Sequence, residues 1–363
     1  MDQFTQYGQY GANNFYGGFQ QQPDPMMQLQ QQKKAEKHSL FVAAAKLGAL
    51  LLIYEALIYA TNYGFYYVLY FIKSGNFTLS FNEVSQYFRN NPESISSSFY
   101  SMLGNLSIVL SSMTILMFIA VLAFKVDFKS MLRPEKQHFT GGAKWFTFSM
   151  TVNVIVSMIV SIIVRIVSTA GITVPEQDFS MTDNSAGTLI MQFMYVVLIG
   201  PVCEELIYRG MIISLLKPYG KGLAVFFSAF IFGFMHGNIP QFVSAFAGGL
   251  VFAAIAVKYD SIVPTIVMHI LNNTTASIND FAEVLNVDDA TTGKIYFSVV
   301  IFCAIIGMYF LFVKFSELKP KEEKTFLLTS GERKRAVFLN VVMLVYFGVI
   351  LLRYIESFIS FNS

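Results

Sequence analysis

The chain has 363 residues, of which 54% are hydrophobic, 16% aromatic and only 13% charged, and its formal net charge is +2. Its mean hydropathy is +0.53. This composition is typical of a membrane protein and excludes an ordinary soluble domain. The small net charge gives no reason to expect a nucleic-acid partner. Two cysteines, Cys203 and Cys303, both lie in apolar stretches, so no disulfide framework is predicted.

The first 39 residues differ in composition from the rest of the chain. They are rich in Gln, Gly, Tyr and Asn and show neither a helical nor a strand period. We therefore expect residues 1–39 to form a disordered cytosolic tail. The tail would serve as a solubilising segment or as a docking site for a partner. A basic start followed by a short apolar stretch and a cleavage site is missing, so a removable signal peptide is not expected. Residues 40–363 are predicted to form one multi-span membrane domain.

Nine apolar runs predict the fold class: an all-α, polytopic helical membrane protein with about eight or nine transmembrane helices. A helix that spans a membrane needs about 20 mainly apolar residues. The first run is too long for one straight span. The fifth run is short and leads into the sixth through Asn238 and Pro240. Each of these two features can change the number of transmembrane helices by one. The runs are 40–72, 103–124, 145–168, 188–216, 222–237, 240–257, 261–278, 294–314 and 336–358.

The distribution of Lys and Arg predicts how the chain is oriented. Basic residues gather before the first run and in every second loop after it, whereas the loops between are acidic. Basic loops are typical of the cytosolic side of a membrane. The sequence therefore predicts an integral membrane protein, of the cell membrane or an endomembrane, with its N-terminus in the cytosol and its C-terminus on the far side.

Three charges interrupt the apolar stretch "GPVCEELIYRGMIISLL", which runs from Gly200 to Leu216. A charged residue at the middle of a span costs roughly 2.5–3.5 kcal/mol on insertion scales, so these charges need partners. Glu205 and Arg209 are four residues apart and can pair on one face of a helix. Glu204 points about 100° away from them. An intramembrane carboxylate without a local partner is costly unless it faces a polar cavity, which predicts such a cavity beside Glu204.

Two of the four histidines, His236 and His269, lie inside apolar runs, and Asn273 follows His269 by one turn on the same helix face. With a rise of about 1.5 Å per residue, Glu204, His236 and Asn273 lie roughly 20 Å from the cytosolic ends of their helices, and His269 roughly 14 Å. Similar depths on three helices predict that these groups share one cavity.

These residues fall in three motifs that resemble those of the CPBP family of intramembrane proteases. The family includes the type II CAAX prenyl endopeptidases and the Abi bacteriocin-immunity proteins. Its motifs Glu-Glu-x-x-x-Arg, Phe-x-x-x-His and His-x-x-x-Asn read here as "EELIYR" from Glu204, "FGFMH" from Phe232 and "HILNN" from His269. The resemblance covers 188–278, which would form the catalytic core. It implies an intramembrane endopeptidase with Glu204, His236, His269 and Asn273 as catalytic residues and Glu205 and Arg209 in support.

The same residues can perform peptide hydrolysis on chemical grounds. Such a reaction needs a base that activates water and donors that hold the oxyanion. Glu204, with His236 beside it, is suited to the first task, and His269 and Asn273 to the second. A zinc ion held by Glu204, His236 and His269, with water as the fourth ligand, is the alternative. The sequence therefore requires no cofactor but leaves zinc open, so the enzyme would be a glutamate-type protease or a zinc metalloprotease.

Two other functions use the same residues without hydrolysis. A non-catalytic scaffold or bacteriocin-immunity protein of the same family would act by binding a partner, and a transporter would use Glu204 and the histidines as a proton relay. The chain shows no internal repeat of hydropathy, which disfavours the transporter. The intact motifs favour the protease over the scaffold. Its expected partners are the lipid bilayer and a peptide or protein substrate, prenylated or otherwise membrane-anchored.

Overall fold

A computed structural model describes residues 24–362 except 96, 172–173, 175–184 and 323–324. Of the described residues 84% are helical, and none of them lies in a strand. In chain order the α-helices are α1 (Pro25–Ser74), α2 (Phe81–Asn90), α3 (Ser98–Leu122), α4 (Lys136–Thr169), α5 (Ala186–Gln192), α6 (Gly200–Glu205), α7 (Ile212–Leu216), α8 (Lys221–Phe234), α9 (Ile239–Tyr259), α10 (Val263–Ala276), α11 (Ile278–Val284), α12 (Asp289–Tyr309), α13 (Ser330–Phe338) and α14 (Val341–Asn362). Short 3-10 helices are η1 (Pro92–Ser94), η4 (Lys217–Tyr219) and η6 (Phe315–Leu318), and π-helices are η2 (Phe193–Ile199), η3 (Leu206–Met211) and η5 (Phe310–Lys314).

The apolar runs correspond to helices of the structure, which confirms the predicted fold class. Among the described residues, seven helical stretches are long and apolar enough to cross a membrane. Two further runs form the 14-residue helices α8 and α10. The break between the fifth and sixth runs is real, because the side chain of Asn238 accepts a hydrogen bond from the backbone N–H of Gln241 and so caps α9.

The first helix begins earlier than the sequence analysis predicts, so the expected boundary of the tail is wrong. Residues 25–39 are helical and continue into the span, whereas residues 1–23 lie outside the described part of the chain. The side chain of Asp24 caps the helix, and Pro25 occupies the first turn, where its missing N–H costs nothing. Lys33 pairs with Glu332 of α13 at 2.8 Å. This contact lowers the pKa of Glu332 to about 2 and ties the early turns of α1 to α13.

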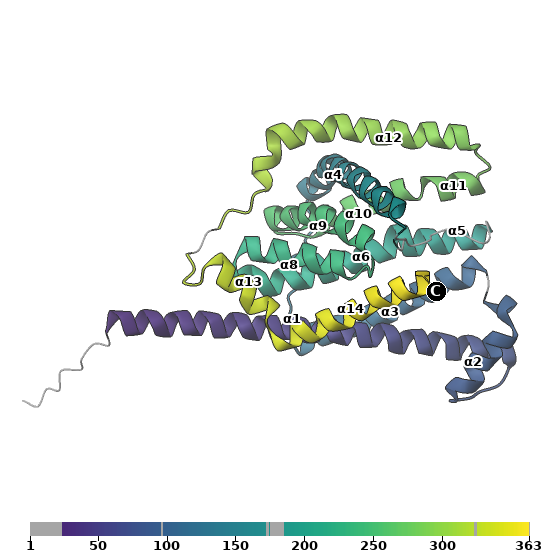
Figure 1. Cartoon of the computed structure of the whole chain (residues 1–363), viewed down its shortest axis with the longest axis horizontal. Helices are drawn as coiled ribbons and strands as arrows, with labels where there is room; N and C mark the ends of the chain where they lie inside the picture. The colour runs from purple at the N-terminus through teal and green to yellow at the C-terminus, as the bar shows by residue number, and fades with distance from the viewer. Residues whose placement is uncertain (1–23, 96, 172–173, 175–184, 323–324, 363) are drawn as a thin grey trace, which may run out of the picture.

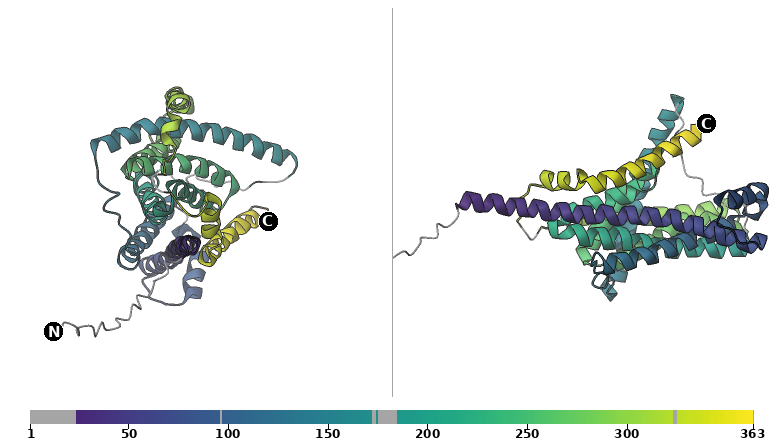
Figure 2. Two further views of the ribbon diagram at one scale, coloured as in Figure 1. Left: turned by 90° about the vertical axis from the view of Figure 1, so that its left-hand side faces the viewer. Right: turned by 90° about the horizontal axis from the view of Figure 1, so that it is seen from below.

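The helices form a bundle whose long axes mostly run the same way (Figure 1). Helix α1 lies along one side of the bundle with α3 and α14 against it, and α12 lies on the opposite side against α4. Between them lie α8, α9, α10 and the broken helix that contains α6. Helices α1 and α14 run in the same direction in both views, so Pro25 and Asn362 lie toward opposite ends of the bundle (Figures 1 and 2). This arrangement agrees with termini on opposite sides of a membrane; that the N-terminus is cytosolic remains a prediction.

The contact between α4 and α12 depends on a glycine. A Cβ atom placed on Gly307 would overlap the backbone oxygen of Thr147 and the side chain of Thr151. The hydroxyl of Thr151 donates to the backbone oxygen of Cys303 at 3.2 Å, across the two helices. No side chain fits between the helices at this point, so α12 approaches α4 closely only because residue 307 is glycine.

We therefore predict that Gly307→Ala destabilises the protein by about 1–3 kcal/mol, the usual cost of overpacking a close contact. The control is Gly293→Ala on the same helix, where no atom lies within 4 Å of the added methyl group. Thermal unfolding of the purified variants measures the difference. A melting temperature for Gly307→Ala equal to that of Gly293→Ala would contradict the predicted packing.

Candidate active site

The first motif lies in a helix that is interrupted on both sides. Helix α6 follows the π-helix η2 and precedes the π-helix η3, all within one continuous stretch from Ala186 to Tyr219. In η2, the N–H of Gly200 bonds to the oxygen of Tyr195, five residues earlier. Single π-turns inside α-helices occur frequently at functional sites. They change which face of the helix each motif residue presents, so simple helix periodicity does not describe this segment.

The carboxylate of Glu205 joins the first and third motifs. It is fully buried, and its Oε1 accepts hydrogen bonds from Arg209 Nη1 at 2.8 Å and from His269 Nδ1 at 2.9 Å. The predicted ion pair of Glu205 with Arg209 is therefore present, and a contact with His269 is added to it. Because Nδ1 donates to Glu205, the other ring nitrogen of His269, Nε2, is left to face the rest of the site.

Arg209 is fully buried between two aromatic rings. Its guanidinium carbon lies 4.2 Å from the ring centroid of Phe232 and 5.2 Å from that of Phe252. Cation–π contacts of this kind stabilise a desolvated cation. Within the described structure, Arg209 Nε and Nη2 have no hydrogen-bond partner. The direct contacts that compensate the charge of Arg209 are therefore the carboxylate of Glu205 and the faces of the two rings.

Glu204 is the more exposed carboxylate of the first motif. About 33% of its side chain is exposed, and its Oε2 lies 3.6 Å from Nε2 of His269. Tyr54 of α1 and Tyr195 of η2 lie within electrostatic reach of it. Glu204 and Glu205 thus flank the two nitrogens of one imidazole, but of the two only Glu204 has exposed side-chain surface. A carboxylate in this position can accept a proton from a water molecule.

His236 lies just beyond the end of α8 and is half-buried. Its Nδ1 lies 2.8 Å from the backbone oxygen of Phe232 and donates to it, which leaves Nε2 as an acceptor. The ring of Phe232 packs edge-on against both His236 and His269, with centroid distances of 5.2 and 6.0 Å. Phe232, the first residue of the second motif, therefore lies between the two histidines. His236 itself shows no direct contact with Glu204 or His269 in the described structure.

Asn273 donates a hydrogen bond to a backbone oxygen whose usual N–H partner in its own helix bonds elsewhere. Its Nδ2 donates to the oxygen of Val196 at 2.7 Å. In an α-helix that oxygen would bond to the N–H of Gly200, but this N–H bonds to Tyr195 instead. The next residue, Pro201, has no N–H. The π-turn and the proline thus leave the Val196 oxygen to Asn273, which holds α10 against η2.

The alternative zinc site does not fit these residues as they are placed. In the part of the chain that the structure describes, no three His, Cys, Asp or Glu side chains lie together as a group that could hold a metal ion. Glu204 and His269 are neighbours, but His236 does not join them. We therefore derive no chemical step through a metal.

The remaining intramembrane charges have structural partners or lie at the surface. Arg353 of α14 forms an ion pair with the buried Glu55 of α1 and thereby joins the first and last helices. The two partners are 298 residues apart in the chain, so no local pattern of the sequence indicates this pair. Arg165 is exposed near the end of α4. Cys203 is buried beside Glu204.

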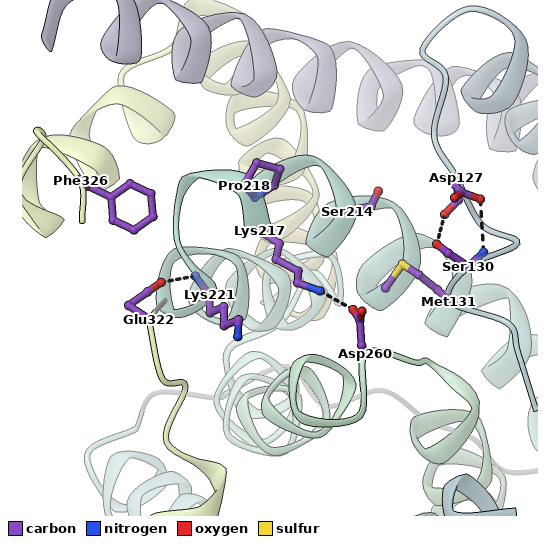
Figure 3. Close-up of a pocket in the computed structure, with 10 residues that line it drawn as sticks. All are labelled: Asp127, Ser130, Met131, Ser214, Lys217, Pro218, Lys221, Asp260, Glu322 and Phe326. Atoms are coloured by element: carbon purple, nitrogen blue, oxygen red, sulfur yellow. Dashed lines mark hydrogen bonds and ion pairs between the residues drawn. The ribbon is translucent and has the colours of Figure 1, made fainter. Parts of the chain in front are cut away.

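A pocket of about 380 Å³ lies at a different place, near the end of the bundle where α7 and α9 end and α8 begins (Figure 3). Lys217 forms an ion pair with Asp260 there, and the carboxylate of Glu322 accepts the backbone N–H groups of Lys221 and Gly222, each at 3.0 Å. Thirteen residues separate Lys217 from Glu204, or roughly 20 Å of helix. The pocket is therefore distinct from the motif residues.

We predict that Glu205→Gln destabilises the fold by about 3–5 kcal/mol, because Arg209 loses the carboxylate that neutralises it. The double variant Glu205→Gln with Arg209→Met should regain most of this stability. Glu204→Gln, whose side chain is partly exposed, is the matched control and should unfold near the wild-type temperature. Thermal unfolding in one detergent compares the three variants, and a fully stable Glu205→Gln would contradict the assignment.

Comparison with known proteins agrees with the motifs. Residues 186–275 match the family model described as type II CAAX prenyl endopeptidase Rce1-like. The segment contains all three motifs, and the match confirms the resemblance to the CPBP family. At the family level it supports a CAAX-type intramembrane protease that acts on membrane-anchored proteins. No curated protein and no solved structure matches the chain.

Proposed function

We propose that this chain, whose segment 186–275 belongs to the CPBP family of intramembrane proteases, hydrolyses a peptide bond of a prenylated or otherwise membrane-anchored protein with water activated by Glu204. The observation that carries the proposal is the placement of the two glutamates around His269. Glu205 is buried and occupied by two donors, whereas Glu204 is partly exposed beside Nε2 of His269. One carboxylate orients the imidazole, and the exposed one is placed to act on a water molecule.

In this reaction Glu204 accepts a proton from water while the water oxygen attacks the carbonyl carbon of the scissile bond. His236 orients the water through Nε2, which is left as an acceptor because Nδ1 donates to Phe232. Nε2–H of His269 and Nδ2–H of Asn273 donate to the oxyanion that forms. The C–N bond then breaks, and the proton held by Glu204 passes to the leaving amine, which gives a carboxylic acid and a free amine.

The charges of the site agree with the roles proposed for these residues. An imidazole that donates from both nitrogens is a cation, so His269 and Arg209 together would balance the two carboxylates, Glu204 and Glu205. Donors placed in a water-poor site before the reaction stabilise an oxyanion more strongly than donors in water do. The buried Glu205–Arg209 pair holds His269 in position for this role.

We predict that Glu204→Gln lowers the rate of peptide cleavage by about 10²–10⁴-fold, the usual contribution of a general base. Purified protein would be assayed in lipid vesicles against peptides that end in a prenylated or an unmodified cysteine motif. Glu356→Gln, an exposed glutamate on α14, is the control and should cleave like the wild type. Full activity of Glu204→Gln would contradict the proposal and favour a non-catalytic scaffold.

The same assay distinguishes the metal-free mechanism from the zinc alternative. Prolonged treatment with a strong zinc chelator should leave the cleavage rate unchanged, because the proposed steps use only side chains and water. Loss of activity on chelation, with recovery on addition of zinc, would contradict the glutamate mechanism and leave the family assignment intact.

A further inference from the structure

Three amide side chains form a row that ends at Asn273, and the reaction proposed above uses only the last of them. Nδ2 of Asn153, on α4, donates to Oδ1 of Asn272 at 3.1 Å. Nδ2 of Asn272 donates in turn to Oδ1 of Asn273 at 3.4 Å. Nδ2 of Asn273 then donates to the oxygen of Val196. The row therefore connects α4, α10 and η2, and Asn153 belongs to none of the three motifs.

The direction of the row follows from its end. The Val196 oxygen can only accept, so Asn273 must present its NH₂ group to it and turn Oδ1 toward Asn272. Asn272 must then present its own NH₂ group to that oxygen, and its Oδ1 faces Asn153. Each amide is thereby held in one of its two possible orientations, which differ by exchange of the oxygen and the NH₂ group. An NH₂ group has two hydrogens, so Asn273 retains one for a further acceptor.

A glycine on a third helix supports the other end of the row. A Cβ atom placed on Gly248 of α9 would lie 2.7 Å from Oδ1 of Asn153. A side chain at position 248 would have to push this oxygen aside, so the Asn153 oxygen occupies its place only because residue 248 is glycine. The space beside Gly248 on α9 thus holds an amide of α4.

We infer that Asn153 and Gly248 position Asn273 for its role at the oxyanion. This inference rests on the proposed function and extends it to two residues outside the motifs. Asn153 holds Asn272 in the orientation that donates to Oδ1 of Asn273, so the Asn273 amide is held at both its oxygen and its nitrogen, with one hydrogen left for the site. Asn153 and Gly248 are positioning residues, since neither contacts Glu204, His236 or His269 in the described structure.

The test is a double-mutant cycle on the cleavage rate. Asn153→Ala removes the first donor of the row, and Gly248→Ala displaces the Asn153 amide, because the atom that the new methyl group meets is the end of a side chain. Each variant should lower kcat about tenfold with KM unchanged, because a misplaced oxyanion donor affects the transition state and not substrate binding. The double variant should match Asn153→Ala alone, since no Asn153 amide is then left to displace.

The controls separate a positioning role from a structural one. Ser157→Ala, one turn further along α4 and exposed, should keep the wild-type kcat, and Asn153→Ala should unfold within a few degrees of wild type. Wild-type kcat in Asn153→Ala, or losses that multiply in the double variant, would overturn the inference. Glu204→Gln is measured alongside: if it retains full activity, the proposed function itself falls, whereas an inactive Glu204→Gln with a fully active Asn153→Ala overturns only the amide row.

Discussion

The buried carboxylate of Glu205 is the contact on which the site depends. Its Oε1 accepts from Arg209 and from His269, so a single atom links η3 to α10. Leaving either the carboxylate or the guanidinium unpaired in a span would cost several kcal/mol. The helices are therefore constrained to an arrangement in which both charges are satisfied. The same arrangement places His269 Nε2 beside Glu204.

Contacts with an aromatic ring also hold the charged and imidazole groups of the site in place. Phe232 contacts the guanidinium of Arg209 and the rings of both His236 and His269. One phenylalanine thus keeps the cation of the first motif and the imidazoles of the second and third motifs in a common apolar setting. This explains in physical terms why a phenylalanine four residues before His236 belongs with the polar residues of the site.

The sequence predicted those features that depend on local pattern. Apolar runs of sufficient length located the helices, and the spacing of four residues predicted the pairing of Glu205 with Arg209. The start of α1 at Pro25 was missed because a Gln-rich segment has no apolar period, although the Asp-Pro cap at its start was a readable signal.

The features that the sequence did not predict depend on contacts between distant residues or on departures from the regular helix. The π-turns around α6 leave the Val196 oxygen to Asn273, and no periodicity of 3.6 residues signals such a turn. The contacts of Glu205 with His269 and of Glu55 with Arg353 join residues 64 and 298 positions apart. Glu204 lies 3.6 Å from His269, but depth along a helix does not fix the direction of a side chain, and His236 turns its Nδ1 to its own helix.

The most direct test of the central claim is the protonation of His269. Solid-state nitrogen NMR of protein labelled at histidine and reconstituted in lipid reports which ring nitrogen carries hydrogen, and the signals of residue 269 are those that disappear in His269→Gln. The account predicts a protonated Nδ1 in the wild type, hydrogen-bonded to Glu205, and a changed Nδ1 signal in the stabilised variant Glu205→Gln with Arg209→Met. A bare Nδ1 in the wild type, or a signal unaffected by that double change, would contradict it.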